Sequence, residues 1–333
     1  MSMPLVVSGP WTPDAKLRAI NKEVGVVFLN YFRDALKVRN WIPWDDLPIK
    51  QINEYGHLLS PDTITIILAY LGVEDYVGDY VEDGLSMLNG QRERRNSQLV
   101  WGMEELKHAE AWALVLLHSG AMTQQQIDDY RDQVSAHKWT MRENHPGLDS
   151  PLGLLVYAMF QERATYFNYD QMRKRIRSEY GLPETATREE RGKNLQIGAA
   201  GAFQIVSRDE IAHHGIFREV VRIHMRYQPA ATLEMIQKVL SGFTMPALYL
   251  IPNAVDLEQA MRRTKLHTPR NQVTEVNNPI LESLNIGDRR NLERLIQQAR
   301  MLPDGLGPEH VIIGESGEMV LSMTPEIALP IGA

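Results

Sequence analysis

The sequence predicts an all-α protein: a four-helix bundle core with additional helices and a small β-hairpin near its C-terminal end. Three observations lead to this fold class. Apolar residues recur at a spacing near 3.6 through most of the chain, and prolines fall in the gaps between these segments. The pattern Glu-x-x-His occurs at 105–108 and again at 210–213, each time preceded by another long helical segment. A bundle built from two similar helix pairs has such a sequence.

Eight helices are predicted from the apolar spacing, in the ranges 14–37, 62–89, 97–119, 124–137, 151–180, 187–228, 230–243 and 288–301. The second begins at Ser60-Pro61-Asp62, where a proline suits the first turn of a helix. The segment 310–323 differs from the rest, because two runs of β-forming residues flank Glu315-Ser316-Gly317. We expect these two runs to form the hairpin.

The length of the chain allows one large domain or two ordinary ones, and it is sufficient for a deep core. It has 333 residues, of which 44% are hydrophobic. We divide it into an N-terminal extension with one helix (1–40), the bundle that carries the chemistry (41–255), and a helical extension with the hairpin (256–333). We expect this last segment to pack on the same domain as the bundle.

Composition excludes several classes of protein. The chain contains no cysteine, which rules out disulfides, iron–sulfur ligation and thiol catalysis and fits a reducing compartment. Its formal charge of -7 argues against general nucleic-acid binding. No uncharged apolar run approaches the roughly 20 residues of a membrane span, and the N-terminus lacks the basic start of a signal peptide. We therefore expect a cytoplasmic protein, or one of the plastid stroma in a eukaryote.

Both Glu-x-x-His pairs lie on the apolar faces of their predicted helices. On a helix, residues three apart share a face, so the carboxylate and the imidazole can reach the same ion. Burying an unpaired carboxylate costs several kcal/mol, and neither face supplies a lysine or arginine, so a metal is favoured over a salt bridge. A third match, Glu54 to His57, lies in a proline-flanked region and is interpreted as accidental. The two faces are Trp101, Glu105, His108, Trp112, Val115 and Val206, Glu210, His213, Phe217, Val220.

A dinuclear site needs one more carboxylate from each of two other helices. Glu74 and Glu162 are lone acids on apolar or aromatic faces of two such segments, whereas Asp75, Asp79 and Glu82 point away from the face of Glu74. Four glutamates and two histidines suit iron or manganese better than zinc. The sequence thus predicts two iron ions (Fe²⁺/Fe³⁺), with manganese as the alternative in one or both positions. The ligands would be Glu74, Glu105, His108, Glu162, Glu210 and His213.

These residues resemble a known family, the soluble acyl-acyl-carrier-protein desaturases of the plant stearoyl type and their actinobacterial relatives. The most specific likeness is Gln161-Glu162-Arg163-Ala164-Thr165 in the third ligand helix. From about Trp41 onward the likeness covers most of the chain, including both paired-ligand helices and the C-terminal end. The resemblance implies a ferritin-like diiron bundle and the same six iron ligands.

The resemblance also implies a function, an acyl-[acyl-carrier-protein] desaturase that uses O₂ to place a double bond in a saturated acyl chain. Trp41, His108 and Asp209 would match an electron route to the iron, and Thr165 would match a hydroxyl that manages oxygen and protons. The implied partners are acyl carrier protein, a ferredoxin-like electron donor, and a second copy of the chain in a homodimer. The link at 89–96 is shorter than in the plant enzymes, so their substrate does not carry over.

Two other functions fit the same ligand set. One is a diiron oxygenase that hydroxylates or N-oxidises a carrier-bound natural-product intermediate. The other is a non-catalytic iron-storage bundle, which the long C-terminal extension and the Gln161–Thr165 segment argue against. Two basic clusters are candidates for docking an acidic carrier, each with a solvated helix face as the alternative interpretation. They are Arg92, Arg94, Arg95 and Arg173, Lys174, Arg175, Arg177.

Overall fold

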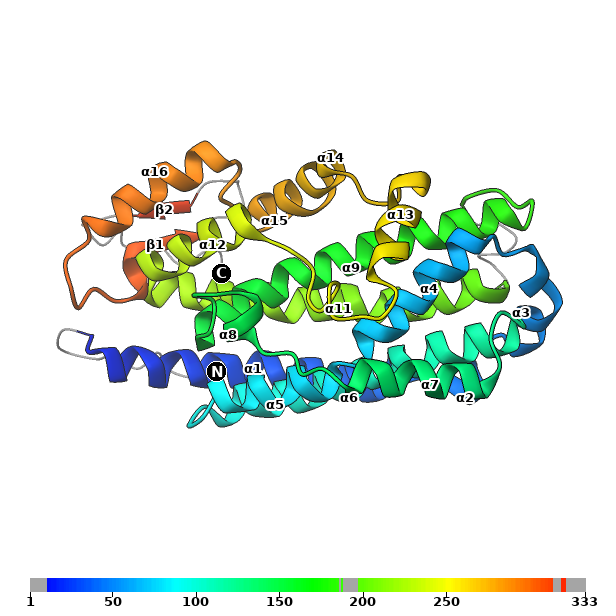
Figure 1. Ribbon diagram of the computed structural model, residues 1–333. Helices are drawn as coiled ribbons and strands as arrows, with labels where there is room; N and C mark the ends of the chain where they lie inside the picture. The colour runs from blue at the N-terminus through cyan, green and yellow to red at the C-terminus, as the bar shows by residue number, and fades with distance from the viewer. Residues whose placement is uncertain (1–10, 186, 188–196, 314–318, 322–333) are drawn as a thin grey trace.

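Four helices form the core of the molecule, as the computed structural model shows for residues 11–185, 187, 197–313 and 319–321. Helix α4 packs against α6, α9 packs along α11, and α6 also contacts α11, so two helix pairs join into one bundle (Figure 1). The predicted all-α fold class is confirmed. The bounds of these helices are α4 (Pro61–Glu74), α6 (Arg92–His118), α9 (Pro151–Glu179) and α11 (Gly198–Tyr227).

Further helices surround this core, and none in the described residues is both long and apolar enough to cross a membrane. They are α1 (Pro13–Lys37), α2 (Pro43–Asp46), α3 (Ile49–Tyr55), α5 (Val77–Met87), α7 (Gln124–Ser135), α8 (Met141–Asn144), α12 (Pro229–Gly242), α13 (Ala254–Thr264), α14 (Pro269–Asn271), α15 (Asn278–Ser283) and α16 (Arg289–Arg300). Short 3₁₀ turns lie at Gly56–Leu58 and Pro308–His310, and a π-helix spans Gln272–Asn277.

Side-chain caps explain where two of the core helices begin. The Ser60 hydroxyl accepts the amide N–H of Thr63 at 3.3 Å, and the Ser150 hydroxyl accepts that of Gly153 at 3.0 Å. A proline follows each of these serines in the first turn, where its missing N–H leaves no hydrogen bond unmade. The predicted starts of both helices are therefore correct to within a residue.

The prediction of one helix over 62–89 is wrong, because the structure breaks it between α4 and α5. The two residues at the break, Asp75 and Tyr76, both form hydrogen bonds with residues of α7. The guanidinium of Arg131 donates to Asp75 at 3.1 Å, and the Tyr76 hydroxyl donates to the carbonyl of Val134 at 3.1 Å. These contacts come from a distant part of the chain, and apolar spacing does not record them.

The C-terminal part contains structure that the sequence analysis missed. Helices α13, α14 and α15 are too short for a clear apolar period, yet α13 packs on α4 beside the core. Strands β1 (Val311–Ile313) and β2 (Met319–Leu321) pair antiparallel. The turn predicted around Glu315 lies outside the described residues, so the hairpin stays a prediction. The helix predicted from 187 begins at Gly198, and residues 188–196 also lie outside the description.

Large aromatic side chains hold the core helices against one another. Trp112 of α6, Tyr169 of α9 and Phe203 of α11 are all fully buried. The Trp112 ring centroid lies 4.3 Å from that of Phe203 and 5.0 Å from that of Tyr169. Three helices thus meet at one packed cluster, which fixes their relative positions next to the polar residues described below.

Candidate metal centre

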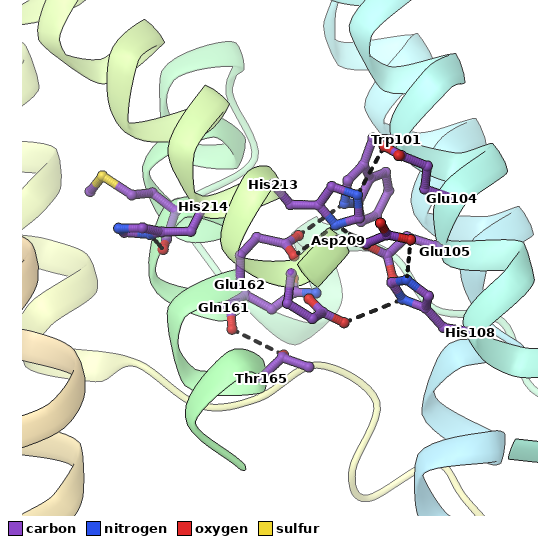
Figure 2. Close-up of polar contacts among 12 residues, drawn as sticks. Trp101, Glu104, Glu105, His108, Gln161, Glu162, Thr165, Asp209, His213 and His214 are labelled. Carbon is purple, nitrogen blue, oxygen red and sulfur yellow. Dashed lines mark hydrogen bonds and ion pairs between the residues drawn. The ribbon is translucent and has the colours of Figure 1, made fainter. Parts of the chain in front are cut away.

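The six residues predicted as metal ligands meet in the middle of the bundle. One comes from the end of α4, two from α6, one from α9 and two from α11. None of them is more than 7% exposed. Figure 2 shows four of these side chains converging from three helices. In chain order, the six are Glu74, Glu105, His108, Glu162, Glu210 and His213.

The six side chains form two overlapping groups of four. Within each group, one ligand atom from every residue lies within 4.8 Å of the other three. Glu105 and Glu210 belong to both groups, and a carboxylate has two oxygens with which to bridge two ions. The arrangement suits a dinuclear site. Each group is completed by one further glutamate and one histidine, Glu74 with His108 and Glu162 with His213.

Both imidazoles turn Nδ1 toward the ligand carboxylates. Nδ1 of His108 lies 3.0 Å from Glu105 and 3.2 Å from Glu210. Nδ1 of His213 lies 2.8 Å from Glu105 and 3.3 Å from Glu162. A ring nitrogen that binds a metal must be unprotonated, so we expect Nδ1 to be the ligand atom and Nε2 to carry the proton.

Asp209 lies on the outer side of His108. Its Oδ2 is 3.3 Å from Nε2 of His108 and accepts the indole N–H of Trp41 at 2.7 Å. The Trp41 ring is nearly parallel to the imidazole, and the Lys107 ammonium lies over it and 3.6 Å from Asp209. The structure therefore brings together the three residues that the resemblance matches to an electron route. That role stays a proposal.

Glu104 makes the equivalent contact with His213, and the sequence analysis missed it. Nε2 of His213 lies 3.2 Å from Glu104, which also accepts hydrogen bonds from the Tyr31 hydroxyl and, at 3.2 Å, from the Arg39 guanidinium. The Glu104 side chain is fully buried. An acidic residue stands directly before both Glu-x-x-His pairs, and this repeat is the sequence signal that points to it.

The charges of the site balance when it holds two divalent cations. Arg39 lies 3.2 Å from Glu104 and 3.9 Å from Asp209, and Lys107 adds a second positive charge beside Asp209. The positive charges of Arg39 and Lys107 offset the negative charges of Glu104 and Asp209. The four ligand glutamates then remain, and two divalent ions supply the matching positive charge.

Burial and neighbouring charges shift the pKa values of the buried acids in different directions. Burial raises the pKa of Glu74 to about 8 and the pKa of Glu210 well above its usual value, and the charge of Glu105 adds to both. Burial also disfavours the charged form of Glu104, but the hydrogen bond and charge of His213 help to bring its pKa down to about 2. The side chains around Glu104 are thus sufficient to keep its carboxylate ionised. Glu74 and Glu210 would need a further cation nearby to be ionised at neutral pH.

Two ligand oxygens also lack a hydrogen-bond donor. Oε1 of Glu105 and Oε1 of Glu210 are buried and make no hydrogen bond, although an imidazole Nδ1 lies near each. Buried acceptor oxygens in proteins almost always have a donor. A cation in each group of ligands would satisfy both oxygens, so these residues fit a dinuclear metal site.

Aromatic donors fix the two remaining ligand carboxylates. The Tyr169 hydroxyl donates to Glu74, and the indole N–H of Trp101 donates to Glu162 at 2.9 Å.

The three other acids near Glu74 in the sequence bind partners outside the candidate metal centre. The sequence analysis expected them to point away from the face of Glu74. Asp75 binds Arg131, Asp79 accepts the amide of Trp139, and Glu82 binds Lys138.

A cavity of about 700 Å³ adjoins the candidate metal centre. Glu74, Glu105 and Glu210 form part of its wall, and the rest is mostly apolar and aromatic. Thr165 lies on the same wall, and its hydroxyl donates to the carbonyl of Gln161 at 3.0 Å (Figure 2). A substrate in this cavity would therefore touch the metal centre directly.

The predicted basic clusters are not free docking faces. Arg94 and Arg177 are only 5% and 4% exposed, so the expectation that they bind a carrier is wrong. Arg173 and Lys174 both bind the carboxylate of Asp170. A run of charges in the sequence does not say which members turn inward, because that depends on what packs against the helix.

The bundle and its buried carboxylate–histidine centre define a helical protein with two groups of side chains that could each hold a metal ion. A family model described as fatty acid desaturase matches residues 96–302, more than half of the chain. The chain belongs to this fatty acid desaturase family, a family of oxidoreductases, as the resemblance in its sequence implied.

Solved structures share the fold. The X-ray structure of DesA2 from Mycobacterium tuberculosis H37Rv, assigned as an acyl-ACP desaturase, matches with a TM-score of 0.51 and 16% identity, over 84% of this chain and 99% of that one. An R2-like ligand-binding oxidase mutant with a Mn/Fe cofactor matches with a TM-score of 0.50 and 13% identity, over 78% of this chain and 92% of that one. At these identities the likeness establishes the ferritin-like fold alone. No curated protein matches the chain.

Proposed function

We propose that this protein is an O₂-dependent desaturase that places a double bond in a saturated acyl chain carried on acyl carrier protein. Membership of the fatty acid desaturase family supports the reaction class. The observation that carries the proposal is the cavity of about 700 Å³ whose wall includes Glu74, Glu105 and Glu210. Methylene groups of an acyl chain in this cavity would lie against the metal centre.

The reaction needs electrons from outside the substrate. It removes two hydrogen atoms from adjacent methylenes and reduces O₂ to two molecules of water, so two further electrons and two protons are required. We propose a ferredoxin-like donor for the electrons. Two iron ions, with manganese as the alternative, would be held by the six ligands and would supply the O₂ chemistry when bound.

The side chains around the site have separate tasks in this proposal. The buried, largely apolar wall excludes water and orients the acyl chain. Trp41, Asp209 and His108 form a hydrogen-bonded path from the α2 side of the bundle to the ligands, along which electrons would enter. The Thr165 hydroxyl, one turn beyond Glu162, would hold a proton at the cavity wall.

The cavity opens beside α13, where a carrier-bound chain would enter. Tyr249 and Val255 belong to its wall and are 62% and 67% exposed. Exposed Lys265 and Arg270 follow α13 in the chain and have no ion-pair partner among the described residues. We propose that these basic residues, in place of the two clusters considered from the sequence, attract the acidic carrier.

One observation favours a second candidate, an oxygenase acting on a carrier-bound intermediate. The cavity wall includes Asn168 and His267, which lie 2.7 Å apart, and Gln161. A simple acyl chain has no group that would bind them. A substrate with its own polar group would do so, and it would gain an oxygen atom at the metal centre.

Mass spectrometry of the product separates the two candidates. Iron-loaded protein is incubated with ferredoxin, its reductase, O₂ and a panel of saturated acyl carriers. A loss of two mass units supports the desaturase, and a gain of sixteen supports the oxygenase. Glu162→Ala should abolish either change, because it removes a ligand of one metal position. If no acyl carrier changes mass, the proposal is wrong.

A further inference from the structure

Three polar side chains follow one another along the wall of the cavity beside the metal centre. Gln161, Thr165 and Asn168 are spaced by four and then three residues on α9, so they lie on one face of that helix. All three belong to the cavity wall. Asn168 lies six residues beyond the candidate ligand Glu162, which is about 9 Å along the helix axis. The polar face therefore leads along α9 away from Glu162.

Asn168 is a buried side chain whose amide is held at one end. It is 6% exposed, and its Oδ1 lies 2.7 Å from Nδ1 of His267. His267 is fixed from its other side as well, because its Nε2 lies 2.9 Å from Oε1 of Gln272. Gln272 in turn donates from Nε2 to Asn277 at 2.9 Å. The Asn168 amide thus has a set orientation before any ligand arrives.

The other end of this amide is free. Nδ2 of Asn168 makes no hydrogen bond within the described residues, and it is not among the buried polar atoms that are sealed off without a partner. It therefore meets open space, and because Asn168 belongs to the cavity wall, that space is the cavity. Leaving a buried polar group unpaired is costly. An amide fixed at one end and free at the other indicates a partner that arrives with the ligand.

Much of the remaining wall suits an aliphatic chain. It includes Met245, Leu248, Leu257 and Met261. Ligand pockets in proteins have volumes of about 300–1,000 Å³, are mostly apolar, and contain a few polar groups that fix the orientation of the ligand. A cavity of about 700 Å³ with a fixed amide among such side chains has this character.

We propose that the substrate is an acyl chain with an oxygen atom of its own, in a hydroxyl or keto group, and that Asn168 selects it. Nδ2 donates to this oxygen, and the methylenes lie against the apolar wall. An unsubstituted chain leaves the amide unpaired, and sites built to hydrogen-bond a hydroxyl reject analogues without one for this reason. The inference rests on the proposed function, because it takes this cavity as the substrate site, and it fits either candidate reaction.

The contact also fixes which carbons of the chain reach the metal centre. With the oxygen bound at Asn168, the position of the chain along α9 is set by the separation between Asn168 and Glu162. It is not set by the carboxyl end of the chain. Moving the oxygen by one carbon therefore moves the reacting carbons by one.

Isothermal titration calorimetry of the whole chain without reductant tests the contact and needs no turnover. The probes are hexadecanoic acid and its monohydroxy isomers, with the hydroxyl moved along the chain. We expect wild type to bind the best isomer at least about tenfold more tightly than the unsubstituted acid, and Asn168→Leu to lose this preference. Thr244→Val is the matched control, because Thr244 is an exposed residue of the same wall and should not affect it. The proposal is overturned by a wild type that binds no isomer more tightly, or by an Asn168→Leu variant that keeps the preference.

A second variant, Asn168→Asp, applies if the leucine variant fails to fold, since it keeps the shape of the side chain. An ionised carboxylate can accept a hydrogen bond from a hydroxyl but cannot donate one to a keto oxygen. We expect wild type to bind the corresponding keto acid more tightly than the unsubstituted acid, and Asn168→Asp to lose that preference while it still binds the hydroxy acid. Equal preference for the keto acid in both proteins would show that Nδ2 does not make the contact.

Turnover separates this inference from the proposed function. If no acyl carrier changes mass, the proposed function fails, and calorimetry still decides whether Asn168 selects chains with an oxygen. If products form, a hydroxyl shifted by one carbon should shift the site of reaction by one carbon, as fragmentation of the product in the mass spectrometer records. A site of reaction at a constant distance from the carboxyl carbon in every isomer would contradict the role of Asn168.

Discussion

Nε2 of His213 lies 3.2 Å from Glu104, a carboxylate that Tyr31 and Arg39 hold in place from the other side. The contact repeats the one between His108 and Asp209. Each imidazole is thus fixed between ligand carboxylates at Nδ1 and one outer carboxylate at Nε2. Its orientation is set before a metal arrives, which is the usual role of such outer partners.

Glu104→Gln should weaken metal binding about ten- to hundredfold, because the amide keeps the shape of the side chain but loses the charge that fixes and polarises His213. Competition with a chelating dye for Mn²⁺ measures the effect without turnover. Glu110→Gln is the matched control, since Glu110 lies on the same helix and binds Arg131 away from the site. Equal affinities for E104Q and wild type would contradict the role of Glu104.

Metal should stabilise the wild type and leave a ligand variant unaffected. At a free concentration of Fe²⁺ or Mn²⁺ a hundred times the dissociation constant, we expect the free energy of unfolding to rise by about 2.7 kcal/mol. Anaerobic thermal unfolding with and without metal measures the gain. Glu162→Ala removes a ligand and should lose most of it. An equal gain in both proteins would place the metal elsewhere.

Without metal, Glu210→Gln should be more stable than the wild type by about 1–3 kcal/mol. Burial and the charge of Glu105 disfavour the ionised Glu210 carboxylate, and the neutral amide avoids that cost. Urea unfolding of the two metal-free proteins at pH 7 compares them. The same variant should gain less than wild type when metal is added. A metal-free variant less stable than wild type would show that the site is not strained by its charges.

Tyr169→Phe should weaken metal binding more than Tyr70→Phe. The Tyr169 hydroxyl donates to the ligand Glu74, whereas the neighbouring Tyr70 hydroxyl is buried without a hydrogen-bond partner. A hydrogen bond to a charged group contributes about 1.5–3 kcal/mol, and the two substitutions remove the same atom from adjacent rings. Metal content after dialysis against a fixed Mn²⁺ concentration separates them. Similar occupancy in both variants would mean that Tyr169 does not position Glu74.

His224 should make the protein less stable in acid. Burial and the charge of Arg94 lower the pKa of His224 to about 3, so the folded state keeps it neutral while the unfolded chain takes up a proton below about pH 6.5. Stability is therefore full above pH 6.5 and falls as the pH drops. Between pH 7 and pH 5 we expect a loss of about 2 kcal/mol in wild type that is missing in His224→Phe, measured by urea unfolding. If the stabilities of wild type and His224→Phe fall in parallel between pH 7 and pH 5, His224 does not cause the loss.

The sequence alone pointed to the candidate ligand residues because both Glu-x-x-His pairs and both lone glutamates lie on apolar helical faces. A polar residue at such a position is expensive to bury, so its presence there indicates a partner. The same reasoning could not find Glu104, which is buried against Tyr31 and Arg39 from another helix and the segment after it. It also placed Arg94 on the surface, although that side chain packs inside.

The sequence by itself thus determined the helical fold class, the six candidate ligands and the family. Only the tertiary structure decided that Glu105 and Glu210 are shared between two groups of ligands, that Glu104 supports His213, and that α4 ends at Glu74. The physical reason is the range of the interactions. Helix periodicity is local and can be read along the chain, whereas these contacts join residues far apart in sequence and exist only once the helices pack.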